Sequence, residues 1–332
     1  MGARTILVTG GAGFIGSHVC KRLRGDGFLP IAYDNLSTGN RRAVRWGPLV
    51  DADIADMAAF VETCERYRPE ALIHFAAAAY VSESVADPDK YYRNNVSGML
   101  SALEACRATG LRIVVFSSSC AVYGDARVVP IDERASLAPV SPYGRTKLIG
   151  EQMLHDFGEA YGMRYAALRY FNASGADPDG ELGEWHDPET HLIPRALLAA
   201  AGRIGRLEVY GDDYPTPDGT CVRDYIHVSD LARAHLLALR RLIEGSNNMR
   251  LNLGAGRGSS VQEVINTIAR VTSRDIPIVV KPRRPGDPPF LYAETALARR
   301  VLGFVPEMSD LETIVRTAAP TFGVAAPLEV VS

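Results

Sequence analysis

Short apolar runs alternate with longer amphipathic segments over the first half of this 332-residue chain. The runs are rich in aliphatic and β-branched residues, as buried strands are, and the segments between them carry apolar positions at helical spacing. The predicted strands are residues 5–9, 29–34, 46–50, 71–75, 112–117 and 165–170. Strands that alternate with helices form a parallel sheet covered on both faces, so the pattern predicts a doubly wound α/β fold.

Two helices are predicted over residues 88–109 and 142–161. Asp87-Pro88 and Ser141-Pro142 each place an N-cap residue before a proline at the first helical position. Apolar residues follow at helical spacing in both segments, and Gly110 ends the first.

The composition of the chain changes after residue 170, where longer predicted loops appear. Residues 175–188 and 210–221 are rich in Asp, Gly and Pro, and loops of this length usually carry function or cover a cleft. We therefore expect two domains, residues 1–170 and a smaller α/β domain over 171–332, with some segments of the second returning to the sheet of the first.

Composition narrows the class of protein. The 36 basic and 39 acidic residues give a net charge of -3, which argues against nucleic acid as a partner. The apolar stretch over 71–81 is far shorter than the roughly 20 residues of a membrane span, and the first strand follows Met1–Arg4 directly, so we expect a cytoplasmic protein. Five cysteines without a C-x-x-C pair indicate free, mostly buried thiols, and no metal site is expected.

A glycine-rich turn, Gly10 to Gly16, directly follows the first strand and opens a helix that runs through Val19 and Leu23. Glycines permit a tight turn and close approach of a ligand to the backbone. The amide N–H groups and the helix N-terminus then hold a pyrophosphate. The position of the turn between a strand and a helix predicts a dinucleotide site.

Asp34 ends the second strand, eighteen residues past Gly16. A carboxylate there accepts hydrogen bonds from the adenosine ribose diol and repels a 2′-phosphate, which favours NAD over NADP. A strand-end Asp also caps turns, here with Asn35, and Arg41 and Arg42 leave NADP open.

Tyr143 and Lys147 lie four residues apart on the second helix, so their side chains share one face. A lysine ammonium beside a phenol is expected to lower the tyrosine pKa from about 10 toward neutrality and give a general base. Ser117, Ser118 and Ser119 end the fifth strand, at the edge of the sheet where doubly wound folds bind ligands. One of these hydroxyls completes a Ser–Tyr–Lys set.

These motifs together resemble those of the extended short-chain dehydrogenase/reductases, and within them the UDP-glucose (UDP-galactose) 4-epimerases. The resemblance covers nearly the whole chain. It rests on residues 9–17, 33–39, 53–54, 74–77, 91–95, 117–124, 143–147, 169–172, 211–216, 222–228, 252–256 and 283–287. The fold implied is a Rossmann NAD-binding domain over 1–170 and a nucleotide-sugar-binding domain over 171–332.

The resemblance also implies site residues. The catalytic set is Ser119, Tyr143 and Lys147. The NAD contacts are Gly10, Gly13, Phe14, Ile15, Gly16, Asp34, Asn35, Ser37, Thr38, Asp53, Ile54, Phe75, Ala76, Ala77, Asn94, Ser117, Tyr143, Lys147, Tyr170 and Phe171. The UDP-sugar contacts are Ser119, Tyr143, Asn172, His191, Leu192, Tyr210, Arg223, Arg284, Asp287 and Leu291. Two arginines suit a diphosphate, which they bind through paired N–H donors.

The implied reaction removes a hydride from sugar C4 to NAD and returns it to the other face of a transient 4-keto sugar, so the net redox change is zero. UDP-glucose and UDP-galactose are the leading pair. The alternatives are UDP-xylose and UDP-arabinose, then an N-acetylhexosamine or a uronate. A 4,6-dehydratase would carry an Asp–Glu pair where this chain has Cys120-Ala121. A non-catalytic NAD-binding sensor would not need the Ser–Tyr–Lys set.

Two departures from the family pattern stand out. Ala79 replaces a lysine that holds the cofactor in many members, so NAD retention is expected to be less tight, and Pro285 replaces a glutamate. The resemblance also implies a homodimer that pairs the helices over 88–109 and 142–161. Leu291 falls where the family borders the sugar C2 substituent, so we expect it to crowd an N-acetyl group. Alternatively, it packs in the core.

Overall fold

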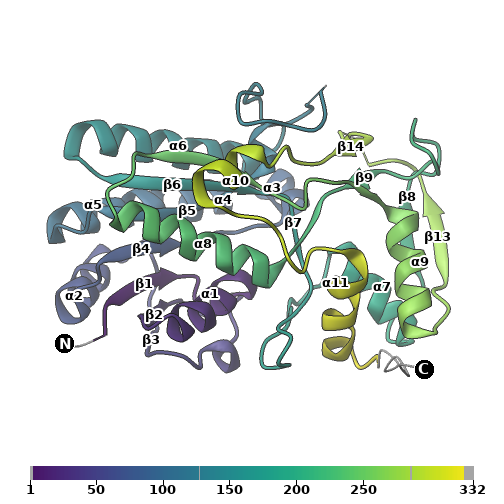
Figure 1. Cartoon of the computed structure of the whole chain (residues 1–332), viewed down its shortest axis with the longest axis horizontal. Helices are drawn as coiled ribbons and strands as arrows, with labels where there is room; N and C mark the ends of the chain where they lie inside the picture. The colour runs from purple at the N-terminus through teal and green to yellow at the C-terminus, as the bar shows by residue number, and fades with distance from the viewer. Residues whose placement is uncertain (1–2, 127, 285, 325–332) are drawn as a thin grey trace.

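A seven-stranded parallel sheet forms the centre of the molecule in the computed structural model, which describes residues 3–126, 128–284 and 286–324 (Figure 1). Its strand order is β3-β2-β1-β4-β5-β6-β11. The strands are β1 (Thr5–Thr9), β2 (Leu29–Tyr33), β3 (Leu49–Val50), β4 (Ala71–His74), β5 (Ile113–Ser119), β6 (Arg164–Tyr170) and β11 (Met249–Leu253). The predicted doubly wound α/β fold is confirmed, and the order reverses between β1 and β4, where such folds bind their ligands.

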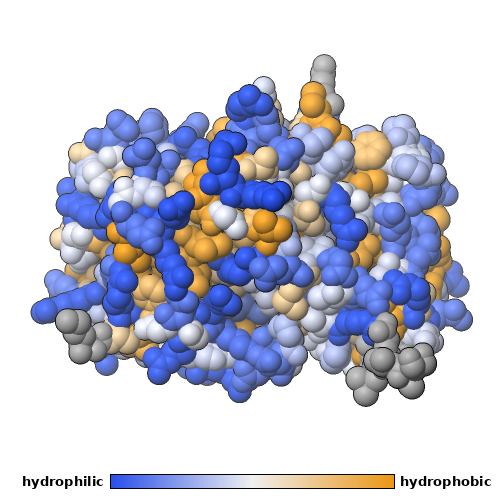
Figure 2. Space-filling view, viewed as in Figure 1, coloured by the Kyte–Doolittle hydropathy of each residue, from blue (hydrophilic) through white to orange (hydrophobic). Residues whose placement is uncertain are grey.

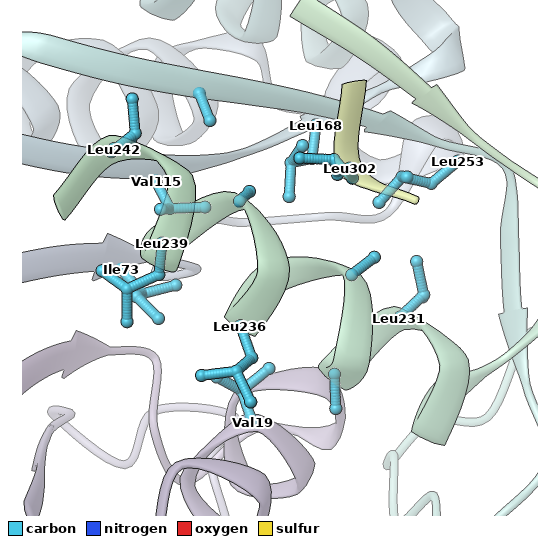
Figure 3. Close-up of a cluster of buried hydrophobic side chains, with 14 of the residues drawn as sticks. Val19, Ile73, Val115, Leu168, Leu231, Leu236, Leu239, Leu242, Leu253 and Leu302 are labelled. Carbon is cyan, nitrogen blue, oxygen red and sulfur yellow. The ribbon is translucent and has the colours of Figure 1, made fainter. Parts of the chain in front are cut away.

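Helices cover both faces of the sheet. One layer contains α1 (Phe14–Gly25), α8 (Val228–Ile243) and α10 (Ala296–Leu302), and the other contains α2 (Met57–Tyr67), α5 (Gly98–Thr109) and α6 (Pro142–Tyr161). Side chains of β1 alternate between the layers, since Ile6 and Val8 pack in the first and Leu7 in the second. Figure 3 shows part of the first layer, with Val19, Ile73, Val115, Leu168, Leu231, Leu236, Leu239, Leu242, Leu253 and Leu302 labelled.

The predicted strands form within one or two residues of their expected bounds, except that the third is much shorter. It starts at Leu49 rather than at residue 46. Pro48 has no N–H to donate to the ladder, although its carbonyl oxygen accepts from Ala32 N–H of β2 (3.0 Å). A Cβ on Gly47 would lie 1.8 Å from the carbonyl oxygen of Pro30, so the chain passes close to β2 at a position that only glycine fits.

Both predicted helices begin and end where the capping residues indicate. The Ser141 hydroxyl accepts from Gly144 N–H (3.1 Å) at the start of α6, and the Asp87 carboxylate accepts from Lys90 N–H at the start of α4 (Pro88–Tyr92). Between α4 and α5, however, residues Arg93–Ser97 form one turn of π-helix that the sequence pattern does not indicate. Such turns are frequent at functional sites, and this one carries Asn94.

The second half of the chain builds the smaller layer at the right of Figure 1 and also supplies β11, which pairs with β6. Residues 175–191 and 211–221 contain no helix or strand. The remaining elements are α3 (Val81–Ala86), β7 (Asn172–Ser174), α7 (Leu192–Ala200), β8 (Leu207–Tyr210), β9 (Val222–Arg223), β10 (Tyr225–His227), β12 (Ser259–Ser260), α9 (Val261–Thr272), β13 (Ile278–Lys281), β14 (Phe290–Leu291) and α11 (Leu311–Ala318). The domain boundary after residue 170 stays a prediction.

The surface is mixed in polarity. Figure 2 shows hydrophilic side chains over most of one face, with apolar side chains between them. Among the described residues, no helix combines the length and the apolar character that crossing a membrane requires. The five cysteines are free, and all except the partly exposed Cys120 are buried, as predicted.

A buried ion pair joins the sheet to α6. Arg169 of β6 binds the carboxylate of Glu151 through two N–H donors, at 2.8 and 2.6 Å, and both side chains are 2% exposed. The hydroxyl of Ser118 donates to the same carboxylate (2.6 Å), and Arg169 also donates to the Tyr123 hydroxyl (2.9 Å). The pair therefore fixes α6 against the ends of β5 and β6.

Removing Arg169 should destabilise the fold because the Glu151 carboxylate would remain buried without a charged partner of equal burial. We expect Arg169→Met to lower the free energy of unfolding by about 3–5 kcal/mol in urea denaturation. Arg250→Met is the control, since Arg250 lies 3.5 Å from the same carboxylate but is 39% exposed. It should cost at most about 1 kcal/mol. Equal effects of the two substitutions would contradict this account.

Candidate functional site

The glycines of the turn after β1 allow its backbone to lie very close to neighbouring segments of the chain. Gly10 has φ +68°, and a Cβ there would lie 2.7 Å from the backbone nitrogen of Ala76, in the loop after β4. A Cβ on Gly16 would lie 2.1 Å from the Gly10 carbonyl oxygen, so α1 packs directly on the turn. Gly13 caps α1, and among the described residues no side chain caps this helix. Its first N–H groups are therefore available to an anion, and the turn fits the pyrophosphate of a dinucleotide.

Asp34 stands at the end of β2, beside this turn. Its carboxylate accepts from Ala12 N–H and Leu36 N–H, both at 2.9 Å, and the residue is 8% exposed. Burial raises the pKa of Asp34, and the two amide hydrogen bonds oppose that rise. Each oxygen keeps a second lone pair, so the carboxylate can also accept from a ribose diol.

A narrow crevice runs in front of the glycine turn. It is lined by Ala12, Gly13, Phe14, Ser17, Thr38, Asn40, Ala43, Gly183, Trp185 and His186. Trp185 and His186 were missed by the sequence analysis, because they belong to a loop more than 160 residues away along the chain. Arg42 stacks on the Trp185 ring at 3.6 Å, and Arg41 pairs with Asp51 at 2.6 Å, so both arginines are engaged within the protein.

Other predicted NAD residues lie on the loops that follow β2, β3 and β4. The Asn35 amide donates to the Asp53 carboxylate (2.7 Å), and the Asn94 amide donates to Asn95 in the π-helical turn. The Phe75 ring, in contrast, packs on His235 of α8 with ring centroids 4.8 Å apart. Its side chain is therefore partly buried against the first layer of the core.

The structure brings the Ser–Tyr–Lys set together where β5 ends beside α6. Lys147 donates to the carbonyl oxygen of Ser117 (2.7 Å), and the hydroxyls of Ser117 and Tyr170 are hydrogen-bonded. Ser119 accepts from Ala121 N–H (3.1 Å), and its hydroxyl is near enough to Tyr143 to lower the pKa of that phenol.

Burial dominates the electrostatics of this set. Burial raises the pKa of Tyr143 to about 12, and the nearby Ser119 hydroxyl partly opposes this rise. Burial also lowers the pKa of Lys147 to about 7. The expectation that Lys147 brings the phenol toward neutrality is therefore wrong for the polypeptide alone. The lysine nitrogen lies 5.8 Å from the Tyr143 ring centre and is held by a backbone carbonyl instead. A further positive charge near the phenol is needed to lower its pKa.

The predicted UDP-sugar residues gather in two adjoining groups. In the first, Arg223 binds Asp287 (3.1 Å), and Leu291 of β14 pairs with Arg223 of β9. In the second, the Arg284 guanidinium lies 3.9 Å from the centre of the Tyr210 ring. Asn172 donates to the carbonyl oxygen of Asp224, next to Arg223 in the chain, and Pro285 lies outside the described residues.

The first group adjoins the Ser–Tyr–Lys set. The charge of Arg223 acts on the Cys120 thiol, directly after Ser119, and opposes the rise in pKa that burial causes there. Leu291 is partly buried against a cluster that also contains Phe171 and Cys120. Leu291 therefore packs partly in the core, as the alternative interpretation holds, while it borders the active-site residues.

His191 lies in a cluster that the sequence analysis did not identify. Its Nδ1 is 2.8 Å from Glu189 and 3.0 Å from Glu184, and His186 faces the same two carboxylates. Burial alone would lower the pKa values of both histidines, but the carboxylates outweigh it and raise them to about 9 for His186 and about 10 for His191. The spacing of His and Glu over residues 184–191 was the available signal.

Comparison with known proteins agrees with this geometry. A sequence model of the NAD dependent epimerase/dehydratase family matches residues 6–254, and the chain belongs to this family. The family resemblance and the choice of NAD as cofactor are thereby confirmed. A UDP-glucose 4-epimerase of Rhizobium leguminosarum bv. trifolii is 49% identical over 318 residues, which are 96% of this chain and 97% of that protein.

Solved structures give the same result. The crystal structure of UDP-glucose 4-epimerase from Brucella ovis in complex with NAD has a TM-score of 0.96 and 62% identity, with 98% of this chain and 100% of that chain covered. The UDP-glucose-4-epimerase of Stenotrophomonas maltophila, with bound NAD and formylated UDP-arabinopyranose, has a TM-score of 0.93 and 39% identity. There the coverage is 96% of this chain and 98% of that chain.

Asp34→Asn tests the predicted ribose contact. The amide replaces one acceptor oxygen by a donor and removes the charge, so we expect NAD to bind at least about 10-fold more weakly, the loss typical of a charged hydrogen bond. The measurement is the NAD retained per chain after gel filtration, followed by titration of the stripped protein. Asp51→Asn is the control, because this carboxylate is 52% exposed and pairs with Arg41. Unchanged NAD retention in Asp34→Asn would rule out the contact.

Proposed function

We propose that this chain interconverts UDP-glucose and UDP-galactose as an NAD-dependent 4-epimerase. The observation that carries the proposal is the placement of Ser119, Tyr143 and Lys147 at the end of β5, on the same edge of the sheet as the glycine turn and Asp34. Membership of the family and the named relatives support the reaction type. The test is a coupled assay in which UDP-galactose is supplied and UDP-glucose is detected, run beside UDP-xylose, UDP-N-acetylgalactosamine and UDP-galacturonate.

In the proposed mechanism, NAD supplies the acceptor and donor of the C4 hydride and a positively charged ring. Tyr143 takes the proton of the C4 hydroxyl, and Ser119, whose hydroxyl acts on the pKa of Tyr143, relays or steadies it. Lys147 would hold the nicotinamide ribose, and the positive charge of the bound ring would lower the phenol pKa from the value that burial imposes. The 4-keto sugar turns within the site, and Tyr143 returns the proton at the end.

The proposed contacts with the nucleotide sugar follow from the chemistry of the side chains. Arg223 and Arg284 suit the two phosphates of UDP, the Tyr210 ring suits the uracil face, and Asp287 suits the uridine ribose diol. The pairs that these residues form with one another in the polypeptide, Arg223 with Asp287 and Arg284 with Tyr210, support the assignment because they gather the groups at one place. Asn172, His191 and Leu192 complete the proposed set.

The alternatives are disfavoured by the residues after Ser119. Dehydration requires an acid–base pair at the positions of Cys120 and Ala121, and burial raises the pKa of the Cys120 thiol to about 12. This group cannot replace a carboxylic acid. A sensor without activity would gain nothing from burying the Lys147 ammonium beside Tyr143, since burial of a charge is costly.

The proposal includes a cytoplasmic location. Five free thiols are typical of a reducing compartment, where disulfides are rare. NAD and nucleotide sugars, the molecules that the site is proposed to bind, are supplied in that compartment.

Tyr143→Phe should leave the fold and NAD binding intact and lower the rate by at least about 10²-fold, the loss typical of a general base. The measurement is turnover in the coupled assay at saturating UDP-galactose. Tyr161→Phe at the other end of α6 is the control, because this tyrosine is 44% exposed. A Tyr143→Phe enzyme that keeps more than half of wild-type turnover would remove Tyr143 from the mechanism.

Leu291 is expected to set sugar size. Its branched end borders the proposed sugar site, so UDP-galactose should be preferred over UDP-N-acetylgalactosamine by about 10–200-fold in kcat/KM. Leu291→Ala should narrow that ratio by accepting the N-acetyl group. Steady-state kinetics with both substrates on both proteins gives the answer. Equal kcat/KM values for the wild type would refute the assignment, whatever the variant does.

We also propose a homodimer that pairs α4, α5 and α6 with those of a second copy. Tyr92 and Leu100 are 37% and 39% exposed on the predicted interface helices, which supports an apolar contact there. Light scattering should give about twice the chain mass of 36.0 kDa at micromolar concentration. Leu100→Glu should shift the measured mass toward that of the monomer. Val305→Glu, at an apolar position that is 47% exposed, should not. A monomeric wild type would refute the dimer.

A further inference from the structure

Four side chains of one loop bring their ligating atoms close together. Glu184, His186, Glu189 and His191, called here the His–Glu cluster, have such atoms all within 4.8 Å of one another. The Glu184 carboxylate oxygen lies 3.1 Å from Nδ1 of His186 and 3.0 Å from Nδ1 of His191. The two oxygens of Glu189 lie 2.8 Å from His191 and 3.6 Å from His186.

These spacings match the edges of a tetrahedral coordination shell. Zinc binds imidazole nitrogen and carboxylate oxygen at about 2.0–2.2 Å, so ligand atoms in a tetrahedron around it are separated by about 3.4 Å. With Oε2 of Glu189 as its ligand atom, three of the measured separations, 3.0, 3.1 and 3.6 Å, are edges of one such shell and lie on both sides of that value. Two carboxylates and two neutral imidazoles also balance a charge of +2.

Two buried polar atoms of the cluster make no hydrogen bond within the described part of the chain, although one of them, Nδ1 of His186, lies 3.1 Å from the Glu184 carboxylate. Among the described residues, Nδ1 of His186 and Oε2 of Glu189 are buried with no hydrogen-bond partner, although they lie 3.6 Å apart. The Glu189 side chain is 7% exposed and that of Glu184 is 5% exposed. Buried polar atoms without partners are rare and point to a missing ligand.

A second acidic group nearby provides a contrast. Asp177, Asp179 and Glu181 also have oxygens close together, but Lys21 binds all three, at 2.7, 2.7 and 2.9 Å. Its ammonium occupies the place of a cation. Among the described residues, no lysine or arginine forms an ion pair with Glu184 or Glu189. Their charged partners are the two imidazoles, and Oε1 of Glu189 also accepts from the N–H groups of Thr190 and His191.

We propose that the His–Glu cluster is a tetrahedral site for a divalent cation of the zinc class, with Nδ1 of both histidines and one oxygen of each carboxylate as ligands. Imidazole ligands favour zinc and its first-row neighbours over magnesium or calcium. This differs from the sequence-based expectation, which found no metal site because it searched for cysteine pairs.

The site would join two parts of the proposed active site. His186 lines the crevice at the glycine turn and packs edge-on against Phe14 at the start of α1, with ring centroids 6.3 Å apart. His191 caps α7 and directly precedes Leu192. Tyr80 contacts both histidine rings. A cation held here fixes the loop between the cofactor side and the sugar-nucleotide side, and the 47% exposed His191 side chain leaves it a route from solvent.

The test is zinc binding by the purified NAD-containing protein. After dialysis against a chelator, the protein is titrated with Zn²⁺ at neutral pH, and bound zinc is measured by elemental mass spectrometry. We expect one tightly bound zinc per chain and a rise in Tm on zinc addition. His186→Asn and Glu189→Gln should each weaken binding by about 100-fold or more, since even loss of an outer-shell partner costs 10–100-fold.

Asp179→Asn is the matched control, because it alters the acidic group that Lys21 already neutralises; its zinc binding should equal that of the wild type. Far-UV circular dichroism identifies any variant that fails to fold. If one of the two ligand variants fails, the zinc binding of the other tests the proposal. Substoichiometric zinc in the wild type, or equal binding in the folded His186→Asn and Glu189→Gln variants, would overturn the proposal and leave an ion-pair network. Zinc binding is measured without turnover, so either result leaves the proposed epimerase reaction untouched.

Discussion

The bidentate ion pair between Arg169 and Glu151 sets the geometry on which the active site depends. It joins β6 to α6, and the same carboxylate accepts from Ser118 between the two other serines of β5. Because both partners are buried, neither can move without leaving an uncompensated charge. The serines at the end of β5 and the face of α6 that carries Tyr143 and Lys147 are thereby held in one arrangement.

That arrangement has an electrostatic consequence. A phenol and an ammonium enclosed by protein both favour their neutral forms, so the pKa of Tyr143 rises while that of Lys147 falls. The polypeptide alone therefore holds a protonated tyrosine. A cationic cofactor ring beside the phenol would shift this balance, which couples proton removal to NAD binding. Such coupling suits an enzyme that must oxidise and reduce within one turnover.

Much of the fold followed from local rules. Asp87-Pro88, Ser141-Pro142 and the glycine turn act on backbone groups within a few residues of themselves, so their helices begin where the sequence indicates. The start of β3 at Leu49 was not predictable from apolar pattern, because it depends on how closely Gly47 approaches β2. The π-helical turn at Arg93–Ser97 likewise reflects packing and hydrogen bonds across the chain, among them that of Asn95 with Thr146.

The candidate site also contains features that the sequence predicts and features that depend on the tertiary structure. Ser119 ends β5, and Tyr143 and Lys147 lie one turn apart on α6. The fold brings these three residues together as expected. The pKa of Tyr143 was predicted with the wrong sign because burial is a property of the tertiary structure. Trp185, His186 and Glu189 were missed for a related reason: their roles come from a long loop that crosses the cofactor crevice, and no periodic pattern marks such a loop.

The central claim is that the hydrogen at sugar C4 leaves and returns within one closed site. The most direct measurement is epimerisation of UDP-galactose deuterated at C4, followed by NMR of the UDP-glucose formed in ordinary water. The account predicts that deuterium stays at C4 of the product, since the hydride never exchanges with solvent. Protium at C4 of the product, appearing as fast as the product itself, would contradict it.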